Sequence, residues 1–270
     1  MKQILLRPVL ALLVFLAMQM AGSILLMVAL AVCLLVTGSP MSAVNQQMAS
    51  PLVISLALII SSVGTIVILH FMKMIEWKSD FNRVNVKAST ILLSLLGGLC
   101  GVVALNILSE FMDLPDILSQ QMVVLCQTVW GALSVALVGP IAEELAFRGA
   151  IQGWMMRHGA KPWLAIAVAS LLFGIGHLNP AQIPFAFLMG CILGFIYYRS
   201  GSLWLCILLH VVNNSLSVIQ TNAMGNEVMS FRLVDWLGGT GPSLAIMLSG
   251  AVVCLAALWL FSRCCKTMGK

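Results

Sequence analysis

Two adjacent carboxylates, Glu143 and Glu144, lie within an apolar stretch, and Arg148 follows four residues after the second one. Ionisable groups in apolar segments are costly to bury, so they usually face a cavity, pair with one another and mark function. On a helix, Glu144 and Arg148 lie on one face and can form an ion pair. Glu143 is turned from that face by about 100°. The spacing therefore leaves Glu143 free for acid or base chemistry.

Two of the four histidines fall within or against later apolar segments. His210 and Asn214 are four residues apart, so their imidazole and amide share one helical face. His177 ends another apolar run. The remaining histidines, His70 and His158, lie near the ends of apolar segments beside basic residues, and we expect them to be interfacial bystanders.

The strongly polar groups of the later segments are few, and they come from three different helices: Glu143, Glu144, Arg148, His177, His210 and Asn214. Each histidine alone could simply satisfy a buried hydrogen bond between helices. Taken together, the six residues favour one shared site.

The composition indicates a membrane protein. The chain has 270 residues, of which 61% are hydrophobic and 9% are charged, whereas soluble domains are about 25% charged. The net charge of +5 does not indicate a nucleic-acid partner, because the basic residues lie between apolar runs. Except for the adjacent Cys264 and Cys265, the eight cysteines are scattered singly through the apolar runs, as is typical of small core residues.

The hydropathy pattern predicts an all-α, polytopic integral membrane protein with about eight transmembrane helices and the site in the second half of the bundle. We expect one membrane domain over residues 1–270. The apolar segments cover residues 9–36, 52–72, 88–107, 122–138, 163–176, 185–198, 203–219 and 243–261. Pro140 suits the first turn of a new helix after a break, which would put both glutamates near a helix N-terminus, where the macrodipole favours negative charge.

Charged residues alternate between the connections. Basic residues precede the first apolar segment and follow the second, fourth, sixth and eighth, whereas the intervening connections are mainly acidic. The positive-inside rule then predicts that both termini are cytoplasmic. With such compact loops, we expect a multi-pass protein of a bacterial plasma membrane.

The polar residues also form three ordered motifs. These are Glu143-Glu144-x-x-x-Arg148, Phe173-x-x-x-His177 and His210-x-x-x-Asn214, with further matches at residues 147–149, 177–180 and 198–202. They resemble the motifs of the CAAX protease and bacteriocin-processing family over about residues 121–219. That family consists of intramembrane glutamic endopeptidases, including the Ras-converting CAAX prenyl endoprotease and the bacterial Abi proteins.

The resemblance implies a role for each residue. Glu143 would activate water with help from His177, and His210 and Asn214 would donate to the oxyanion of the tetrahedral intermediate. Glu144 and Arg148 would be the supporting ion pair. The implied partner is a peptide or membrane-associated protein, prenylated or not, within the lipid bilayer, and no cofactor is expected.

Other interpretations of these residues stay open. Glu143, His177 and His210 could bind Zn²⁺ with an open position for water, as in a metalloprotease. The same fold could also serve without hydrolysis, as a membrane scaffold, an immunity protein or a proton-coupled carrier.

Overall fold

The computed structural model describes residues 2–38, 40, 42, 46–47, 50–81 and 87–265. Helices make up nearly all of these ranges, which contain no strand. In chain order the elements are α1 (Lys2–Val36), α3 (Pro51–Phe71), α4 (Trp77–Phe81), α5 (Ala88–Met112), α6 (Ser119–Cys126), α7 (Val129–Leu133), η1 (Ser134–Val138), α8 (Gly139–Glu144), η2 (Leu145–Gly153), α9 (Trp154–Arg157), α10 (Pro162–Gly176), α11 (Gln182–Ser200), α12 (Leu203–Met224), η3 (Gly225–Met229), α13 (Leu233–Trp236) and α14 (Thr240–Cys264).

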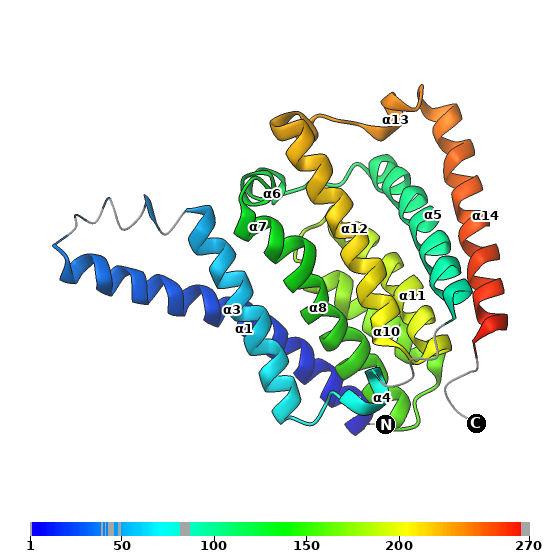
Figure 1. Ribbon diagram of the computed structural model, residues 1–270, viewed down its shortest axis with the longest axis horizontal. Coiled ribbons are helices and arrows are strands. Elements are labelled where there is room, and N and C mark those ends of the chain that lie inside the picture. Colours follow the sequence, from blue (N-terminus) through cyan, green and yellow to red (C-terminus); the bar gives the residue numbers. More distant parts are fainter. Residues whose placement is uncertain are drawn as a thin grey trace.

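The predicted fold class is confirmed, because the chain is an all-α, polytopic membrane protein. Seven helices among the described residues are long and apolar enough to cross a membrane. The remaining predicted segment, the fifth along the chain, is the shorter apolar helix Pro162–Gly176. The helices form one bundle, from which the second half of α1 extends away after crossing α3 (Figure 1). At this crossing Gly22 packs against Ser61 so closely that a methyl group would clash.

The predicted helix start at Pro140 is wrong. One continuous helix runs over Val129–Arg157, and the break comes earlier, where the Thr128 hydroxyl accepts a hydrogen bond from the N–H of Gly131. Pro140 is accommodated because the preceding turn, η1, is a π-helix. Glu143 and Glu144 therefore lie in mid-helix, and the predicted stabilisation by a helix N-terminus does not apply.

Small residues allow the helices around the site to pack closely. Gly190 of α11 lies against the backbone of Ser170 in α10, and Gly97 and Gly101 of α5 face Ala257 and Cys254 of α14. A side chain at any of these glycines would push the helices apart. Gly97 and Gly101 are four residues apart, a spacing that is common at helix contacts in membrane bundles.

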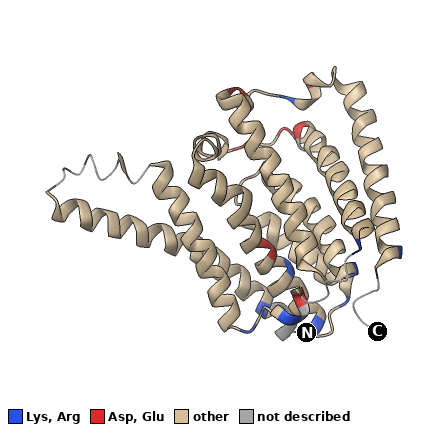
Figure 2. Cartoon of the chain, in the orientation of Figure 1, with Lys and Arg blue, Asp and Glu red and all other residues tan. Residues whose placement is uncertain are grey.

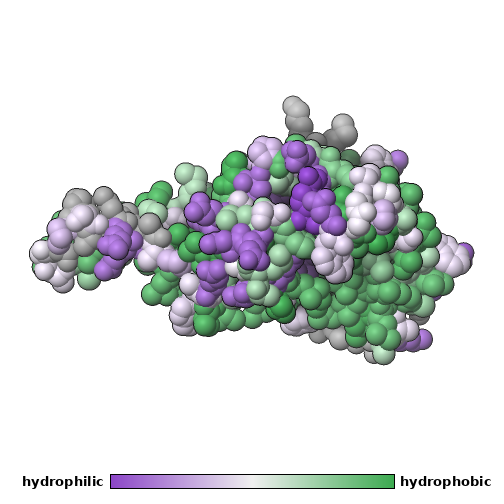
Figure 3. All heavy atoms as spheres, turned by 90° about the horizontal axis from the view of Figure 1, so that it is seen from above, coloured by the Kyte–Doolittle hydropathy of each residue, from purple (hydrophilic) through white to green (hydrophobic). Residues whose placement is uncertain are grey.

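The two ends of the bundle differ in charge. Lysines and arginines gather at the end where the N- and C-terminal segments lie, which we call the basic end (Figure 2). Acidic residues of the 110–118 and 225–239 connections lie at the opposite end, the acidic end. Viewed from the acidic end, hydrophilic side chains gather over the middle of the bundle and apolar ones surround them (Figure 3). This distribution is expected where the helix ends emerge from the hydrocarbon core of a bilayer into water.

Candidate active site

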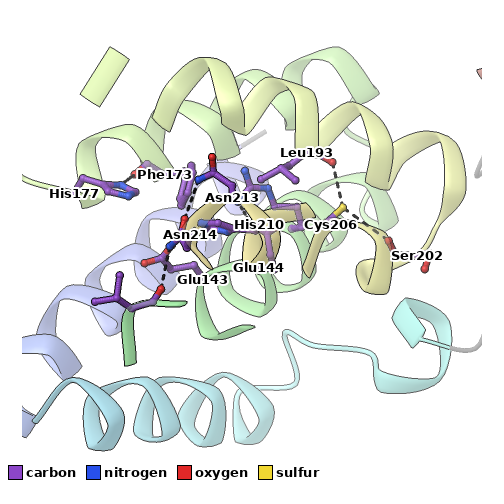
Figure 4. A network of polar contacts seen from close by, with 12 residues as sticks. Glu143, Glu144, Phe173, His177, Leu193, Ser202, Cys206, His210, Asn213 and Asn214 are labelled. Atoms are coloured by element: carbon purple, nitrogen blue, oxygen red, sulfur yellow. Dashed lines mark hydrogen bonds and ion pairs between the residues drawn. The ribbon is translucent and has the colours of Figure 1, made fainter. Parts of the chain in front are cut away.

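The carboxylate of Glu144 is the centre of the polar cluster inside the bundle. Its side chain is fully buried. Its Oε1 accepts hydrogen bonds from Arg148 Nη1 at 2.9 Å and from His210 Nδ1 at 2.8 Å. The predicted ion pair between Glu144 and Arg148 is therefore present. The same carboxylate also binds His210, which lies beside Glu144 in Figure 4.

Glu143 lies beside this cluster but is more open. Its side chain is 22% exposed, and its Oε2 is 3.6 Å from His210 Nε2. His210 thus lies between two carboxylates, with Nδ1 toward Glu144 and Nε2 toward Glu143. A carboxylate accepts hydrogen bonds but donates none, so Nδ1 carries the proton in the bond to Glu144. With a second proton on Nε2, His210 would carry one positive charge. The charges of Glu143, Glu144, Arg148 and His210 would then sum to zero.

Asn214 binds a backbone carbonyl that Pro140 leaves free. In the π-turn η1, the N–H of Gly139 donates to the carbonyl of Ser134, five residues earlier. The next bond in this series would reach Val135, but proline has no N–H. Asn214 Nδ2 donates to the Val135 oxygen instead, at 3.1 Å. The sequence could not reveal this link, because the two residues are 79 positions apart.

Asn213 is a site residue that the sequence analysis missed. Its Nδ2 donates to Asn214 Oδ1 at 2.9 Å. The amide of Asn214 is thereby held at both its oxygen and its nitrogen, and one of its two N–H groups is left to donate elsewhere. The adjacent pair of asparagines on an apolar helix was the available signal.

Phe173 connects the remaining residues of the cluster. The guanidinium of Arg148 lies 4.4 Å from the centre of its ring, and the rings of His177 and His210 meet it edge-on at 4.8 and 5.7 Å. His177 Nδ1 is 2.8 Å from the Phe173 carbonyl oxygen, which fixes that nitrogen as the donor and leaves Nε2 as an acceptor.

The structure brings four of the six predicted residues into direct contact, places Asn214 beside them, and joins His177 to them through the ring of Phe173. Glu143, Glu144, Arg148 and His210 form one cluster, and Asn214 lies next to it (Figure 4). Within the described part of the chain, the hydrogen-bond partner of His177 is Phe173 and not Glu143.

The burial of the Glu144–Arg148 pair has an energetic consequence. Their side chains are 0% and 1% exposed. Breaking a buried pair by removing one partner typically costs about 3–5 kcal/mol, because an uncompensated charge is left behind. Each member therefore also holds the other in place, and together they fix the orientation of His210.

The donor set does not form an evident metal site. Within the described ranges, no group of three or more His, Cys, Asp or Glu side chains is arranged to hold a metal ion. Nδ1 of His210 is engaged by Glu144, and the cation Arg148 shares the same carboxylate oxygen.

A second polar cluster, which the sequence analysis did not predict, lies at the basic end. Asp80 of α4 is 1% exposed, and its Oδ1 accepts hydrogen bonds from Tyr197 at 2.6 Å and Arg157 at 3.2 Å. Arg157 also donates to the carbonyl oxygens of Met74 at 2.9 Å and Gly149 at 3.4 Å. The helix that bears the glutamates is therefore tied at its end to α4 and α11.

Comparison with known proteins agrees with the motifs. Residues 125–216 match the family model described as "Type II CAAX prenyl endopeptidase Rce1-like". The predicted resemblance to this family is confirmed over that segment. This family segment contains all six predicted site residues, as well as Asn213 and the π-helical turns around the glutamates.

One curated relative also matches the chain. It is a protein of Bacillus subtilis (strain 168) named "Putative membrane peptidase YdiL", 32% identical over 84 residues. The match covers 31% of this chain and 34% of that protein, so the chain matches about a third of the relative's length. No solved structure gives a significant match.

We predict that Asp80 makes the stability of the protein depend on pH. Burial raises the pKa of its carboxyl, although Tyr197 and Arg157 both act to lower it. From about pH 4 up to the raised pKa, the folded state then binds more protons than the unfolded state. The free energy of unfolding should therefore fall as the pH rises through this window, and Asp80→Asn should lack that fall.

Thermal denaturation in detergent from about pH 4 to about pH 7 measures this difference. Asp113→Asn, at an exposed carboxylate of the acidic end, is the matched control and should follow the wild type. An unchanged pH dependence in Asp80→Asn would contradict the burial of this carboxylate.

Proposed function

We propose that this chain is an intramembrane endopeptidase that uses Glu143 to activate water. The observation that carries the proposal is His210, held between a fully buried carboxylate and a partly exposed one. Glu144 already has two hydrogen-bond donors, so Glu143 is the carboxylate available to accept a proton from water. The match to a family of endopeptidases supports the same reaction class.

In the proposed reaction, Glu143 takes a proton from water while the water oxygen attacks the peptide carbonyl carbon. The carbonyl oxygen becomes an oxyanion, which accepts hydrogen bonds from the remaining N–H of Asn214 and from His210 Nε2 in its doubly protonated form. The C–N bond then breaks, and the proton held by Glu143 passes to the leaving amine. His177, whose Nε2 is free to accept a hydrogen bond, would orient the attacking water.

The Glu144–Arg148 pair has a supporting role in this scheme. Because Oε1 of Glu144 accepts the Nδ1 proton of His210, the buried carboxylate stabilises the imidazolium that donates to the oxyanion. Arg148 balances the charge of Glu144 and lies over the ring of Phe173. We propose that the reaction needs no metal ion, since a guanidinium already occupies the position beside the carboxylate.

The proposed substrate is a peptide or a membrane-associated protein, with a prenylated CAAX-like sequence as one candidate. We further propose that the chain lies in a bacterial plasma membrane, with the basic end and both termini in the cytoplasm. The separation of basic and acidic residues between the two ends supports this orientation (Figure 2).

We expect Glu143→Gln to lower peptide turnover by about 10²–10⁴-fold, the usual contribution of a general base. The protein should still insert and fold, since Glu143 is partly exposed. Turnover of a library containing unmodified and farnesylated peptides measures the effect in purified protein. Glu227→Gln, an exposed glutamate of η3, is the control and should keep wild-type turnover. Equal activity of both variants would refute the assignment of Glu143.

We expect Asn214→Ala and His210→Ala to lower kcat by about 10²–10³-fold, as loss of an oxyanion donor does elsewhere. KM should change less than kcat, because the donors act mainly in the transition state. Turnover of the wild type should be indifferent to chelators and to added zinc. Stoichiometric zinc in active protein, lost together with activity in His210→Ala, would instead support a metalloprotease. Solute uptake that survives in Glu143→Gln would support a carrier.

The proposed orientation predicts a labelling pattern for single cysteines in a cysteine-free background. Cysteines replacing Ile117 and Asp235, exposed at the acidic end, should react with an impermeant thiol reagent on intact cells. Cysteines replacing Lys78 and Lys161, exposed at the basic end, should react only after permeabilisation. The opposite pattern would invert the orientation, and labelling of all four from one side would contradict the spanning arrangement.

A further inference from the structure

The connection between α10 and α11 leads from His177 to the acidic end of the molecule. α10 has 15 residues, which span about 22 Å, less than the hydrocarbon core of a bilayer at about 30 Å. His177 follows directly after its last residue, Gly176, and α11 begins at Gln182. The few residues between these helices therefore decide where the His177 ring lies.

The backbone of this connection is strained next to His177. Leu178 has φ of +51°, a left-handed conformation that is unfavourable for a residue other than glycine. Its side chain is 64% exposed, so little packing of its own offsets this cost. Strained residues persist only where neighbouring contacts hold them, and they occur often at functional sites.

Asn179 supplies those contacts. It is fully buried, its Nδ2 donates to Asp116 Oδ1 at 2.8 Å, and its Oδ1 accepts the N–H of Ile117 at 3.3 Å. A backbone bond of 3.3 Å from Ala181 to Pro115 lies alongside. The connection after α10 is thus joined to the 115–117 turn, which is more than 60 residues distant in sequence.

We propose that Asn179, held by Asp116, is a positioning residue that sets the location of His177 in the active site. The ring of His177 is already fixed relative to α10 by its bond to the Phe173 carbonyl. What remains to be fixed is the backbone at Leu178, and the Asn179–Asp116 bond fixes it. This inference rests on the proposed function, in which His177 orients the attacking water.

A second set of hydrogen bonds at the acidic end offers a matched comparison for the Asn179–Asp116 bond. Glu110, in the last turn of α5, accepts the N–H groups of Leu233 and Val234 at 2.7 and 2.9 Å. This carboxylate also joins two segments that are distant in sequence, but its hydrogen-bond partners among the described residues are not residues of the site. If the Asn179–Asp116 bond were purely structural, its loss should affect the protein in the same way as the loss of the Glu110 bonds. If the bond positions His177, its loss should also lower turnover.

Asp116→Ala and Glu110→Ala test this distinction. Asp116 is exposed, so its loss should leave the protein folded. We expect Asp116→Ala to lower kcat about tenfold with KM within about twofold, since small misplacements of reacting groups cost this much or more. Glu110→Ala should lower the melting temperature in detergent and leave kcat unchanged. Equal kcat for Asp116→Ala and the wild type would overturn the proposal.

The bond can also be restored with its polarity reversed. Asn179→Asp places two carboxylates opposite each other and should lose turnover, whereas the double variant Asp116→Asn/Asn179→Asp again pairs one amide with one carboxylate. We expect the double variant to recover kcat to within about threefold of the wild type, because paired residues show coupled effects. If the double variant is no better than Asn179→Asp, the bond does not position His177.

A measurement that does not depend on peptide cleavage can test this proposal independently of the proposed function. The ring-nitrogen NMR signals of His177, assigned with His177→Gln in histidine-labelled protein, should shift in Asp116→Ala and return in the double variant. Such a shift in a protein that cleaves no peptide would support the positioning and refute the protease. Unchanged signals together with Glu143-dependent turnover would refute the positioning alone.

Discussion

The buried carboxylate of Glu144 is the group on which the rest of the site depends. A single oxygen of this carboxylate accepts hydrogen bonds from both Arg148 and His210. An isolated ionised group in such surroundings would be strongly disfavoured, so the guanidinium and the imidazole are needed for the carboxylate to stay charged there. In turn the carboxylate gives His210 a defined proton position and points its other nitrogen toward Glu143.

The continuity of the helix through Pro140 is the second constraint. A break at the proline would have separated the glutamates from η1 and placed them at a helix end. Instead the π-turn keeps the helix intact and leaves the Val135 carbonyl to Asn214. A residue that usually ends helices therefore provides the acceptor that orients the amide beside the glutamates. Local π-turns of this kind are frequent at functional sites.

Hydrogen bonds between polar side chains at both ends of the bundle hold the apolar helices together. Asp80, Tyr197 and Arg157 join three segments at the basic end, and Asp116 and Asn179 join two connections at the acidic end. Between helices in lipid there is no hydrophobic driving force comparable to that in water, so close packing and hydrogen bonds carry the specificity. Each tie adjoins an element that bears a site residue, the glutamate helix or α10.

The sequence by itself determined the helical class, the apolar segments, the separation of charges and the Glu144–Arg148 pair. All of these follow from hydropathy and from the spacing of residues along one helix, which are local properties. It also singled out His210 and Asn214 as residues of one helical face. Only the tertiary structure decided that Asn214 binds Val135, that Asp80 meets Tyr197 and that Asn179 meets Asp116. These partners lie in different helices or connections, 63 to 117 residues apart, and no periodicity along one helix can reveal which segments pack together.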